Sequence, residues 1–316
     1  MATPLKIVFM GTPAIAGHIL ERLVAAAGQS FRVTGVVTQP DRPRGRKLRP
    51  TPSEVGEVAI RLGIPTLKPE KVRTPEFLTT INSFSPDLLI VVAYGKILPE
   101  PVLNTAKIAP INIHASLLPR HRGAAPIEAA ILAGDAETGV TIMRMTAKMD
   151  AGPIYLKHAM PISSGDTQGS LKEKLAELGA AAMIEAFELL IAGELSETPQ
   201  DESLATYCKP VEKRDAVIDW GADAAKIERM IRAYDPWPVA RTTIAGDELL
   251  IWRAAVETTS KDGAPGEVIA VSPVPIIKCG TGALKLIEVQ AAGRKRMAAA
   301  DFMRGRRIEA GARLGN

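Results

Sequence analysis

The first part of the chain alternates short apolar runs with patterns typical of helices. The apolar runs predict buried strands at KIVFMG (6–11), FRVTGVVTQP (31–40), DLLIVVAYG (87–95) and APINIHA (109–115). Helical spacing after the first run predicts a helix over 12–28, with Thr12 as its N-cap and Pro13 at its first position. Further helices are predicted over 54–62, 75–84 and 125–133. Strands that alternate with helices favour an α/β fold with a parallel sheet.

The pattern then changes. Two strands are predicted at 138–146 and 152–162, joined by the turn AKMDAG (147–152), and one long helix follows over 167–193. The stretch ELSETPQDESLATYCKP (194–210) is polar and aperiodic, as a linker would be. A short helical pattern at 224–233 and short strands at 240–246, 248–257, 266–272, 275–282 and 283–290 indicate a small barrel. We therefore expect a first domain over 1–190, a linker over 191–207 and a second domain over 208–316.

Length and charge agree with two domains. A chain of 316 residues exceeds what one core usually supports. The net charge is +4, and residues 206–316 carry all of it, with 18 Lys and Arg against 14 Asp and Glu, because the first 205 residues have 21 of each. This placement indicates an anionic partner for the C-terminal domain.

The two cysteines and the first residues of the chain indicate the compartment in which the protein works. Cys208 and Cys279 have neither CxxC spacing nor neighbouring histidines, so we expect reduced thiols and no zinc site or disulfide framework. The first residues lack the apolar core of a signal peptide, and no run of about 18 apolar residues occurs. These observations predict a cytoplasmic protein without a membrane segment.

The turn after the first predicted strand lacks a nucleotide-binding signature. FMGTPAIAG (9–17) has only Gly11 and Gly17 where a dinucleotide-binding fold has GxGxxG, and no GxxxxGK[ST] motif occurs. NAD and FAD are therefore not expected. The turn is either a tight strand-to-helix connection or a helix start whose backbone amides face the site.

The stretch INIHASLLPRHRGAAP (111–126) carries the strongest chemical signal. Asn112 and His114 are two residues apart in a predicted strand, so they share a face near the edge where parallel sheets bind ligands. A lone histidine is commonly a structural one, but an amide and an imidazole together can stabilise an oxyanion. Asp150, in the turn AKMDAG, could orient the imidazole. No Ser or Cys lies in a nucleophile motif, so the pattern suggests direct transfer of an acyl-type group to a substrate nucleophile.

These residues together resemble the folate-dependent formyltransferases. The resemblance includes Asn112, His114, the loop SLLPRHRG (116–123) and Asp150 within DAGPI (150–154). Further stretches are similar to the methionyl-tRNA formyltransferase family within that superfamily, namely FMGTP (9–13), TQPDRPRGRKLRPTP (38–52), VVAYGKILP (91–99), DPWP (235–238) and DFMRGRR (301–307). The resemblance covers nearly the whole chain.

The resemblance implies a fold and a set of site residues. The fold would be α/β, with an N-terminal Rossmann-like formyltransferase domain that has a mostly parallel sheet, and a C-terminal OB-like β-barrel. The formyl donor would be 10-formyltetrahydrofolate, the acceptor initiator methionyl-tRNA, and no metal would be needed. Asn112, His114 and Asp150 would be catalytic; the folate site would contain Tyr94, Gly95, Ile97, Ser116, Leu117, Leu118 and Pro119.

Two groups of basic residues would contact the tRNA. One is the loop after the second strand, with Arg42, Arg44, Arg46, Lys47 and Arg49; its key arginine would be Arg46 or, with a shifted register, Arg44. The other is Arg304, Arg306 and Arg307 in the C-terminal domain. We expect a monomer. Two other functions stay open: formyl transfer to a small amine, such as a glycinamide ribonucleotide or an amino sugar, and a catalytically silent RNA-binding module.

Overall fold

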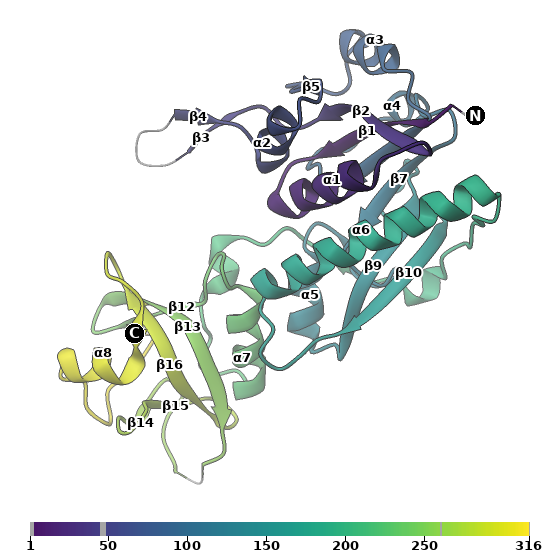
Figure 1. Ribbon diagram of the computed structural model, residues 1–316. Coiled ribbons are helices and arrows are strands. Elements are labelled where there is room, and N and C mark those ends of the chain that lie inside the picture. Colours follow the sequence, from purple (N-terminus) through teal and green to yellow (C-terminus); the bar gives the residue numbers. More distant parts are fainter. Residues whose placement is uncertain (1–2, 45–48, 260, 316) are drawn as a thin grey trace. The chain divides into compact units, whose positions relative to one another are not determined.

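The computed structural model describes residues 3–44, 49–259 and 261–315. The chain forms two compact units (Figure 1). Unit 1 consists of Met1–Pro126, Glu137–Pro161 and Lys172–Cys208, and unit 2 of Ile127–Ala136, Ile162–Leu171 and Lys209–Asn316.

Unit 1 is built on a seven-stranded sheet with the order β10-β9-β7-β6-β1-β2-β5. Its strands are β1 (Leu5–Gly11), β2 (Phe31–Val37), β5 (Thr66–Leu67), β6 (Leu88–Val92), β7 (Ala109–His114), β9 (Glu137–Arg144) and β10 (Ile154–Pro161). The five strands from β7 to β5 pair in parallel, whereas β9 is antiparallel to β7 and to β10. The predicted, mostly parallel sheet is confirmed.

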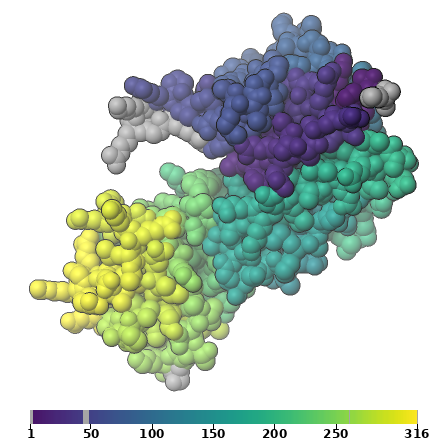
Figure 2. Space-filling model, viewed as in Figure 1, coloured from purple at the N-terminus to yellow at the C-terminus, as the bar shows by residue number. Residues whose placement is uncertain are grey.

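Helices cover both faces of this sheet. On one face, α6 (Gln168–Ala192) packs against β7 and against α1 (Ala14–Ala26), because a Cβ at Gly179 would lie 3.1 Å from Ile113 and 3.3 Å from Ile19. Figure 2 shows the teal and green surface of α6 beside the purple surface of α1. On the other face, α3 (Pro75–Ser83) and α4 (Glu100–Leu103) share a buried cluster with the alternate β-strand residues Val8, Met10, Leu89 and Val91.

The start of α1 differs from its prediction. The N-cap of the helix is Pro13, without a side-chain hydrogen bond, and the helix begins at Ala14. The Thr12 hydroxyl instead donates to the Tyr94 carbonyl oxygen at 3.0 Å. The prediction of Thr12 as N-cap was therefore wrong: this side chain ties the end of β1 to the end of β6, a long-range contact that local spacing does not reveal.

The caps of two other helices follow the local rules. Ser53 caps α2 (Glu54–Arg61) by accepting from the Gly56 N–H, and Thr74 caps α3 by accepting from the Phe77 N–H. Between β2 and α2, the basic loop forms a hairpin of β3 (Arg42–Arg44) and β4 (Arg49–Thr51), in which Arg44 pairs with Arg49.

The polar stretch that follows α6 is bound to unit 1. Thr198 and Ile154 exchange two backbone hydrogen bonds of 2.8 and 2.9 Å. A short helix, η1 (Glu202–Leu204), precedes β11 (Tyr207–Cys208), which pairs in parallel with β8 (Arg122–Gly123). Residues 194–208 thus form part of the structure of unit 1.

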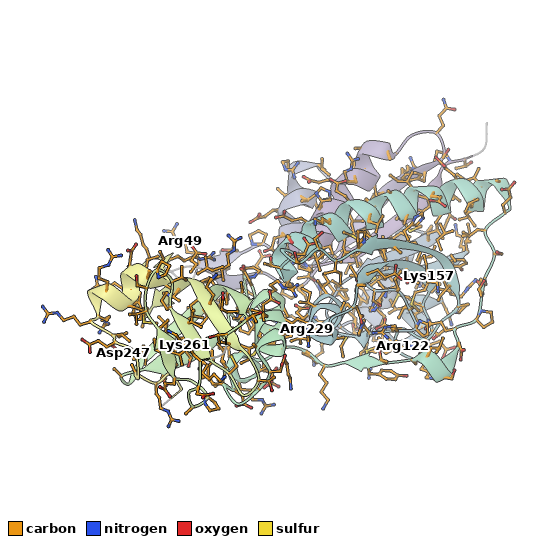
Figure 3. All side chains as sticks on the ribbon, turned by 90° about the horizontal axis from the view of Figure 1, so that it is seen from below. Arg49, Arg122, Lys157, Arg229, Asp247 and Lys261 are labelled. Atoms are coloured by element: carbon orange, nitrogen blue, oxygen red, sulfur yellow. The ribbon has the colours of Figure 1, made fainter. Side chains whose placement is uncertain are left out.

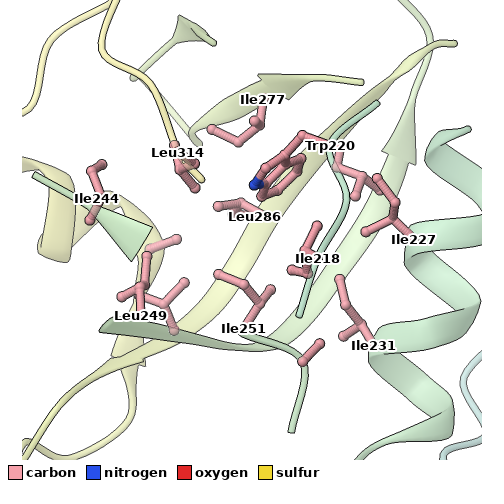
Figure 4. Packing of buried hydrophobic residues seen from close by; sticks show 14 of the residues in the cluster. Ile218, Trp220, Ile227, Ile231, Ile244, Leu249, Ile251, Ile277, Leu286 and Leu314 are labelled. Atoms are coloured by element: carbon pink, nitrogen blue, oxygen red, sulfur yellow. The ribbon is translucent and has the colours of Figure 1, made fainter. Parts of the chain in front are cut away.

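Unit 2 contains an antiparallel sheet with the order β12-β13-β16-β15-β14 and with β17 beside β16. Its elements are α5 (Pro126–Ala133), η2 (Lys213–Ala216), α7 (Ala224–Ala233), β12 (Arg241–Ile244), β13 (Asp247–Glu257), β14 (Val268–Ala270), β15 (Ile276–Lys278), β16 (Ala283–Ala291), β17 (Met297–Ala298) and α8 (Ala299–Gly305). Trp220, Ile251 and Leu286 belong to its buried core, which α7 joins through Ile227 and Ile231 (Figure 4).

The last residues connect the two edges of this sheet. Leu314 bridges Ile244 at the end of β12, and Arg313 bridges Glu267 beside β14. The backbone bonds from Leu314 N–H to Gly266 and from Gly315 N–H to Thr243 are both 2.8 Å long. Because β12 and β14 are the sheet's two edge strands, the tail gives the sheet the closure of a small barrel.

A matched pair of isoleucines tests the core of unit 1. Ile90 in β6 is fully buried, whereas Ile60 in α2 is 63% exposed. Ile90→Ala should lower the free energy of unfolding by about 2–5 kcal/mol because it leaves a cavity, and Ile60→Ala should change it by about 0.5 kcal/mol or less. Urea unfolding followed by hydrogen exchange of the β6 amides measures both. Equal losses would contradict the assignment of this core.

Candidate active site

The carboxyl ends of the parallel strands bring together the polar groups predicted from the sequence. β7 ends at His114. Asn112 lies beside Val91 of β6 and Met143 of β9, and His114 lies beside Thr141 of β9. Ile111 and Ile113, which alternate with them, are buried. The pleat therefore puts Asn112 and His114 on the face opposite α6.

Asp150 reaches the same place from the connection between β9 and β10. Its Oδ2 accepts from the Gly123 N–H at 2.8 Å, and its Oδ1 lies 3.4 Å from Nδ2 of Asn112. His114 Nδ1 lies 3.8 Å from Oδ2, beyond hydrogen-bond distance. The structure thus brings Asn112 and His114 to the carboxylate of Asp150. Asp150 is 36 or more residues away from both of them in the sequence.

The orientation of the His114 ring follows from its other nitrogen. Nε2 lies 3.0 Å from the carbonyl oxygen of His121. A carbonyl can only accept, so Nε2 carries a hydrogen and donates it. In the neutral ring, Nδ1 is then the lone-pair nitrogen, and it is the one beside Asp150. His114 is 6% exposed.

This arrangement can handle charge and protons at a carbonyl. Nδ1 of His114 can take a proton and, once protonated, donate to a developing oxyanion, while Asp150 stabilises the imidazolium. The Asn112 amide has two hydrogens, and its long contact with Asp150 uses one. The site can therefore present two donors to one oxygen.

The loop after β6 holds three of the predicted folate residues in different environments. Tyr94 is 2% exposed in the cluster under α3 and α4, and burial raises the pKa of its hydroxyl to about 12. Its carbonyl oxygen accepts from Thr12 and, at 3.0 Å, from Gln39 Nε2. Gly95, with φ of 84°, is exposed, and Ile97 is 68% exposed. Tyr94 thus fixes the backbone, and Gly95 and Ile97 present the accessible surface.

The loop after β7 is more occupied with internal contacts. The Ser116 hydroxyl donates to the Arg120 carbonyl, and the Leu118 N–H donates to the Thr141 hydroxyl. Leu118 is 1% exposed and packs on Met143 and Ile154. Leu117 and Pro119 are half-buried. Of these four side chains, Leu117 and Pro119 are the accessible ones.

The predicted tRNA residues lie on the surface where the structure describes them. Arg42 and Arg49 are exposed at the base of the β3–β4 hairpin; Arg44 is the third residue of β3, and Arg46 and Lys47 lie outside the described residues. Arg304 pairs with Asp301 at 3.2 Å and Arg306 with Asp247 at 3.1 Å, each with more than half of the arginine side chain exposed. Arg307 is exposed too.

Sequence reasoning missed two residues beneath the site, Arg122 and Gln200. Arg122, labelled in Figure 3, is fully buried, although its type is usually exposed. Gln200 lies in the stretch predicted as a linker, yet it donates two hydrogen bonds to the turn that carries Asp150. An aperiodic polar sequence gives no signal for such contacts.

The described residues contain neither a cluster of metal ligands nor a membrane-spanning helix. Among the described residues, no group of three or more His, Cys, Asp or Glu side chains could hold a metal ion. Within the same ranges, no helix combines the length and apolar character needed to cross a bilayer. Cys208 and Cys279 form no disulfide, and burial raises the pKa of Cys279 to about 11.

The sequence matches two family models that together span most of the chain. The model described as "Formyl transferase" matches residues 5–187, and "Formyl transferase, C-terminal domain" matches residues 210–307. The chain belongs to the formyl transferase family.

Curated relatives show which kind of formyl transferase the chain resembles. The methionyl-tRNA formyltransferase of Methylococcus capsulatus is 46% identical over 98% of this chain and 100% of its own length. That of Aromatoleum aromaticum is 45% identical over 99% of this chain and 98% of its own. The chain is thus a member of the methionyl-tRNA formyltransferase family, and the resemblance inferred from its motifs is confirmed.

Solved structures share the fold at low identity. HypX from Aquifex aeolicus in complex with tetrahydrofolic acid superposes with a TM-score of 0.61 at 20% identity, over 96% of this chain and 47% of that one. An N-formyltransferase from Helicobacter canadensis, in complex with folinic acid and dTDP-3-aminofucose, has a TM-score of 0.63 at 16% identity, over 91% of this chain and 99% of that one. The chain spans about half the length of HypX.

Proposed function

We propose that this protein transfers the formyl group of 10-formyltetrahydrofolate to the α-amino group of initiator methionyl-tRNA. The product is N-formylmethionyl-tRNA for translation initiation, so the reaction takes place in the cytoplasm. The observation that carries this proposal is the group of Asn112, His114 and Asp150 at one sheet edge, within a chain 46% identical to a methionyl-tRNA formyltransferase over nearly its full length. A folate-type formyl donor and a tRNA acceptor follow from family membership.

The three site residues act first on the attacking amine and then on the folate. An α-amine has an ordinary pKa near 8, so much of it is available as the neutral nucleophile. Its nitrogen bonds to the formyl carbon, and Asn112 Nδ2 and protonated His114 Nδ1 stabilise the oxyanion. The bond from the formyl carbon to N10 of the folate then breaks, and the proton lost by the amine reaches N10 through His114. Asp150, whose Oδ2 lies 3.8 Å from Nδ1, orients the ring and stabilises the imidazolium.

The folate is placed in the crevice between residues 91–99 and 114–119. The Leu118 N–H and its carbonyl oxygen already contact Thr141 and Lys157, so the main chain of residues 93–97 is the better partner for the pterin's polar edge. Ile97 and Leu117 are accessible apolar side chains that can cover its flat faces.

Affinity for tRNA is assigned to the two basic surfaces. The ion pairs of Arg304 and Arg306 are exposed, and such pairs contribute little, so both arginines can turn to phosphates at small cost. On the same unit, the Arg296 guanidinium lies 3.2 Å from the centre of the Trp252 ring. The hairpin arginines Arg42 and Arg49 are exposed on unit 1, and Arg46 and Lys47 are assigned to the same basic surface from the sequence alone.

The choice of acceptor tests the proposed function directly. The enzyme is incubated with 10-formyltetrahydrofolate and one of four amines: initiator methionyl-tRNA, free methionine, a glycinamide ribonucleotide or a nucleotide-linked amino sugar. Formylated product, measured by mass spectrometry, should form with the charged tRNA at a kcat/KM at least about 10³-fold above that of the others, since phosphate contacts supply most binding. Preference for a small amine would replace this proposal by the rival activity, and no transfer to any acceptor would favour a silent RNA-binding module.

Substitution of the three catalytic residues should lower kcat without unfolding the protein. His114→Ala or Asn112→Ala should each cost about 10²- to 10³-fold, the usual loss for an oxyanion donor. Asp150→Asn should be similar, and the double variant with His114→Ala should fall far short of the product of the single losses. His158→Ala is the matched control, because His158 is a half-exposed residue of β10 that pairs with Glu185. A near-normal kcat in His114→Ala would remove the assignment.

The salt dependence of tRNA binding should report the phosphate contacts of unit 2. Neutralising Arg304, Arg306 and Arg307 together should flatten the slope of log K against log salt by up to about 2 to 3 units, if all three meet phosphates. A control with the same charge change replaces Arg32, Lys71 and Arg73, which are exposed on unit 1. Binding titrations over a range of salt measure both. Equal slopes in the two triple variants would place the tRNA path elsewhere.

A further inference from the structure

Arg122 is a charged side chain without contact to water. It is fully buried, and its guanidinium donates to three side chains. Nε and Nη2 lie 3.1 and 2.8 Å from Gln200 Oε1, Nη1 and Nη2 lie 3.2 and 2.9 Å from the Glu202 carboxylate, and Nη1 lies 3.1 Å from the Tyr207 hydroxyl. A buried charge is tolerated only when it is paired and hydrogen-bonded. All three partners belong to the segment 198–208, so Arg122 fixes this segment in place.

Gln200 extends the contact from Arg122 to the catalytic turn. Its oxygen accepts from Arg122, and its Nε2 donates to the carbonyl oxygens of Asp150 at 2.9 Å and Gly152 at 2.7 Å. The side-chain oxygen of Gln200 therefore accepts from the buried arginine, and both of its N–H hydrogens bond to the backbone of the turn that carries the catalytic carboxylate.

The same segment holds the loop on the other side of that carboxylate. Arg122 N–H donates to the Thr206 carbonyl at 2.9 Å, and His121 N–H donates to the Thr206 hydroxyl at 2.8 Å. These bonds position two groups that touch the catalytic residues: the His121 carbonyl, which accepts from His114, and the Gly123 N–H, which donates to Asp150. Segment 198–208 is thus the common support of both loops.

The supported residues have backbone conformations that need support. Asp150 and His121 have φ angles of 49° and 58°, in the left-handed region that costs free energy for residues other than glycine. Such conformations persist where the surroundings over-determine them. A Cβ at Gly123, where φ is 120°, would lie only 2.2 Å from the Cys208 carbonyl oxygen, so β11 also restricts this position.

We propose that Gln200, held by Arg122, is a positioning residue for the formyl transfer reaction. It touches neither reactant. It sets the distance between the Asp150 carboxylate and the His114 ring by fixing the turn 150–152, and Arg122 keeps its amide in the one orientation that presents both N–H groups to that turn. This inference rests on the proposed function, and it adds Gln200 alone to the residues that position the Asp150 carboxylate.

The decisive variant is Gln200→Glu. Glutamate has the same shape and can still accept from Arg122, but it has no N–H for the Asp150 and Gly152 carbonyl oxygens. We expect kcat to fall roughly 10- to 100-fold, because a displacement near 1 Å at a catalytic group has effects of this size. The KM values for folate and for methionyl-tRNA should stay within about twofold of wild type, whereas the thermal midpoint should fall, because two carbonyl oxygens lose their donors.

Glu202→Gln is the matched control. This variant replaces a carboxylate that binds Arg122 by an amide, which is the reverse of the change at Gln200. It removes no hydrogen bond to the turn 150–152, so kcat should stay near that of wild type. Hydrogen bonds from Arg122 and then Lys148 hold the pKa of Glu202 at about 2, below its ordinary 4.5. Its contribution to stability is therefore complete above pH 4.5 and is lost only as the pH falls toward 2. Assays near neutral pH thus leave this ion pair charged.

A second variant covers the case in which Gln200→Glu fails to fold. Arg122→Lys keeps the charge but cannot hold the Gln200 oxygen with two N–H groups, so kcat should fall with the KM values unchanged. Wild-type kcat in a folded Gln200→Glu or Arg122→Lys enzyme would overturn the proposal, as would equal losses in Gln200→Glu and Glu202→Gln. An inactive wild-type enzyme would instead refute the proposed function, so the two failures are distinguishable.

Discussion

Burial of the Arg122 guanidinium is the constraint on which the catalytic unit depends. The charge cannot be left without partners in the interior. Its partners come from residues about 80 positions further along the chain, Gln200 and Glu202 among them. Forming these bonds requires the segment after α6 to return to the sheet edge, and this return brings donors to the two loops around Asp150. A polar and largely exposed segment is thereby fixed against unit 1.

The sheet explains why the reactive groups meet where they do. Parallel strands end at a common edge, so Asn112 and His114 of β7 lie near the loop that leaves β6. Because β9 is antiparallel to β7, its last residue Arg144 lies beside Ile111, near the start of β7. The connection from β9 to β10 therefore has to lead back along the sheet to bring Asp150 beside Asn112 and His114.

Much of this was predictable from local patterns, and the exceptions share a cause. Short apolar runs predicted the strands β1, β2, β6 and β7, and the shared face of Asn112 and His114 follows from the alternation of side chains along a strand. The assignment of Thr12 as N-cap failed because its hydroxyl bonds to Tyr94, 82 residues away. Arg122, Gln200 and the closure of the barrel by Leu314 were missed for the same reason, since each depends on a partner distant in sequence.

The position of the domain boundary follows from these contacts. A boundary drawn by composition falls near the end of α6, where the sequence becomes polar. The physical boundary lies at Cys208, because β11 pairs with β8 and the segment before it carries the ligands of Arg122. The charge of the chain changes near the same point, because the first 205 residues have equal numbers of basic and acidic side chains and the residues after them carry the whole net charge of +4. A positive field concentrated on one unit raises the local concentration of a polyanion there, whereas a carboxylate site such as that of Asp150 functions without an excess of positive charge on its own unit.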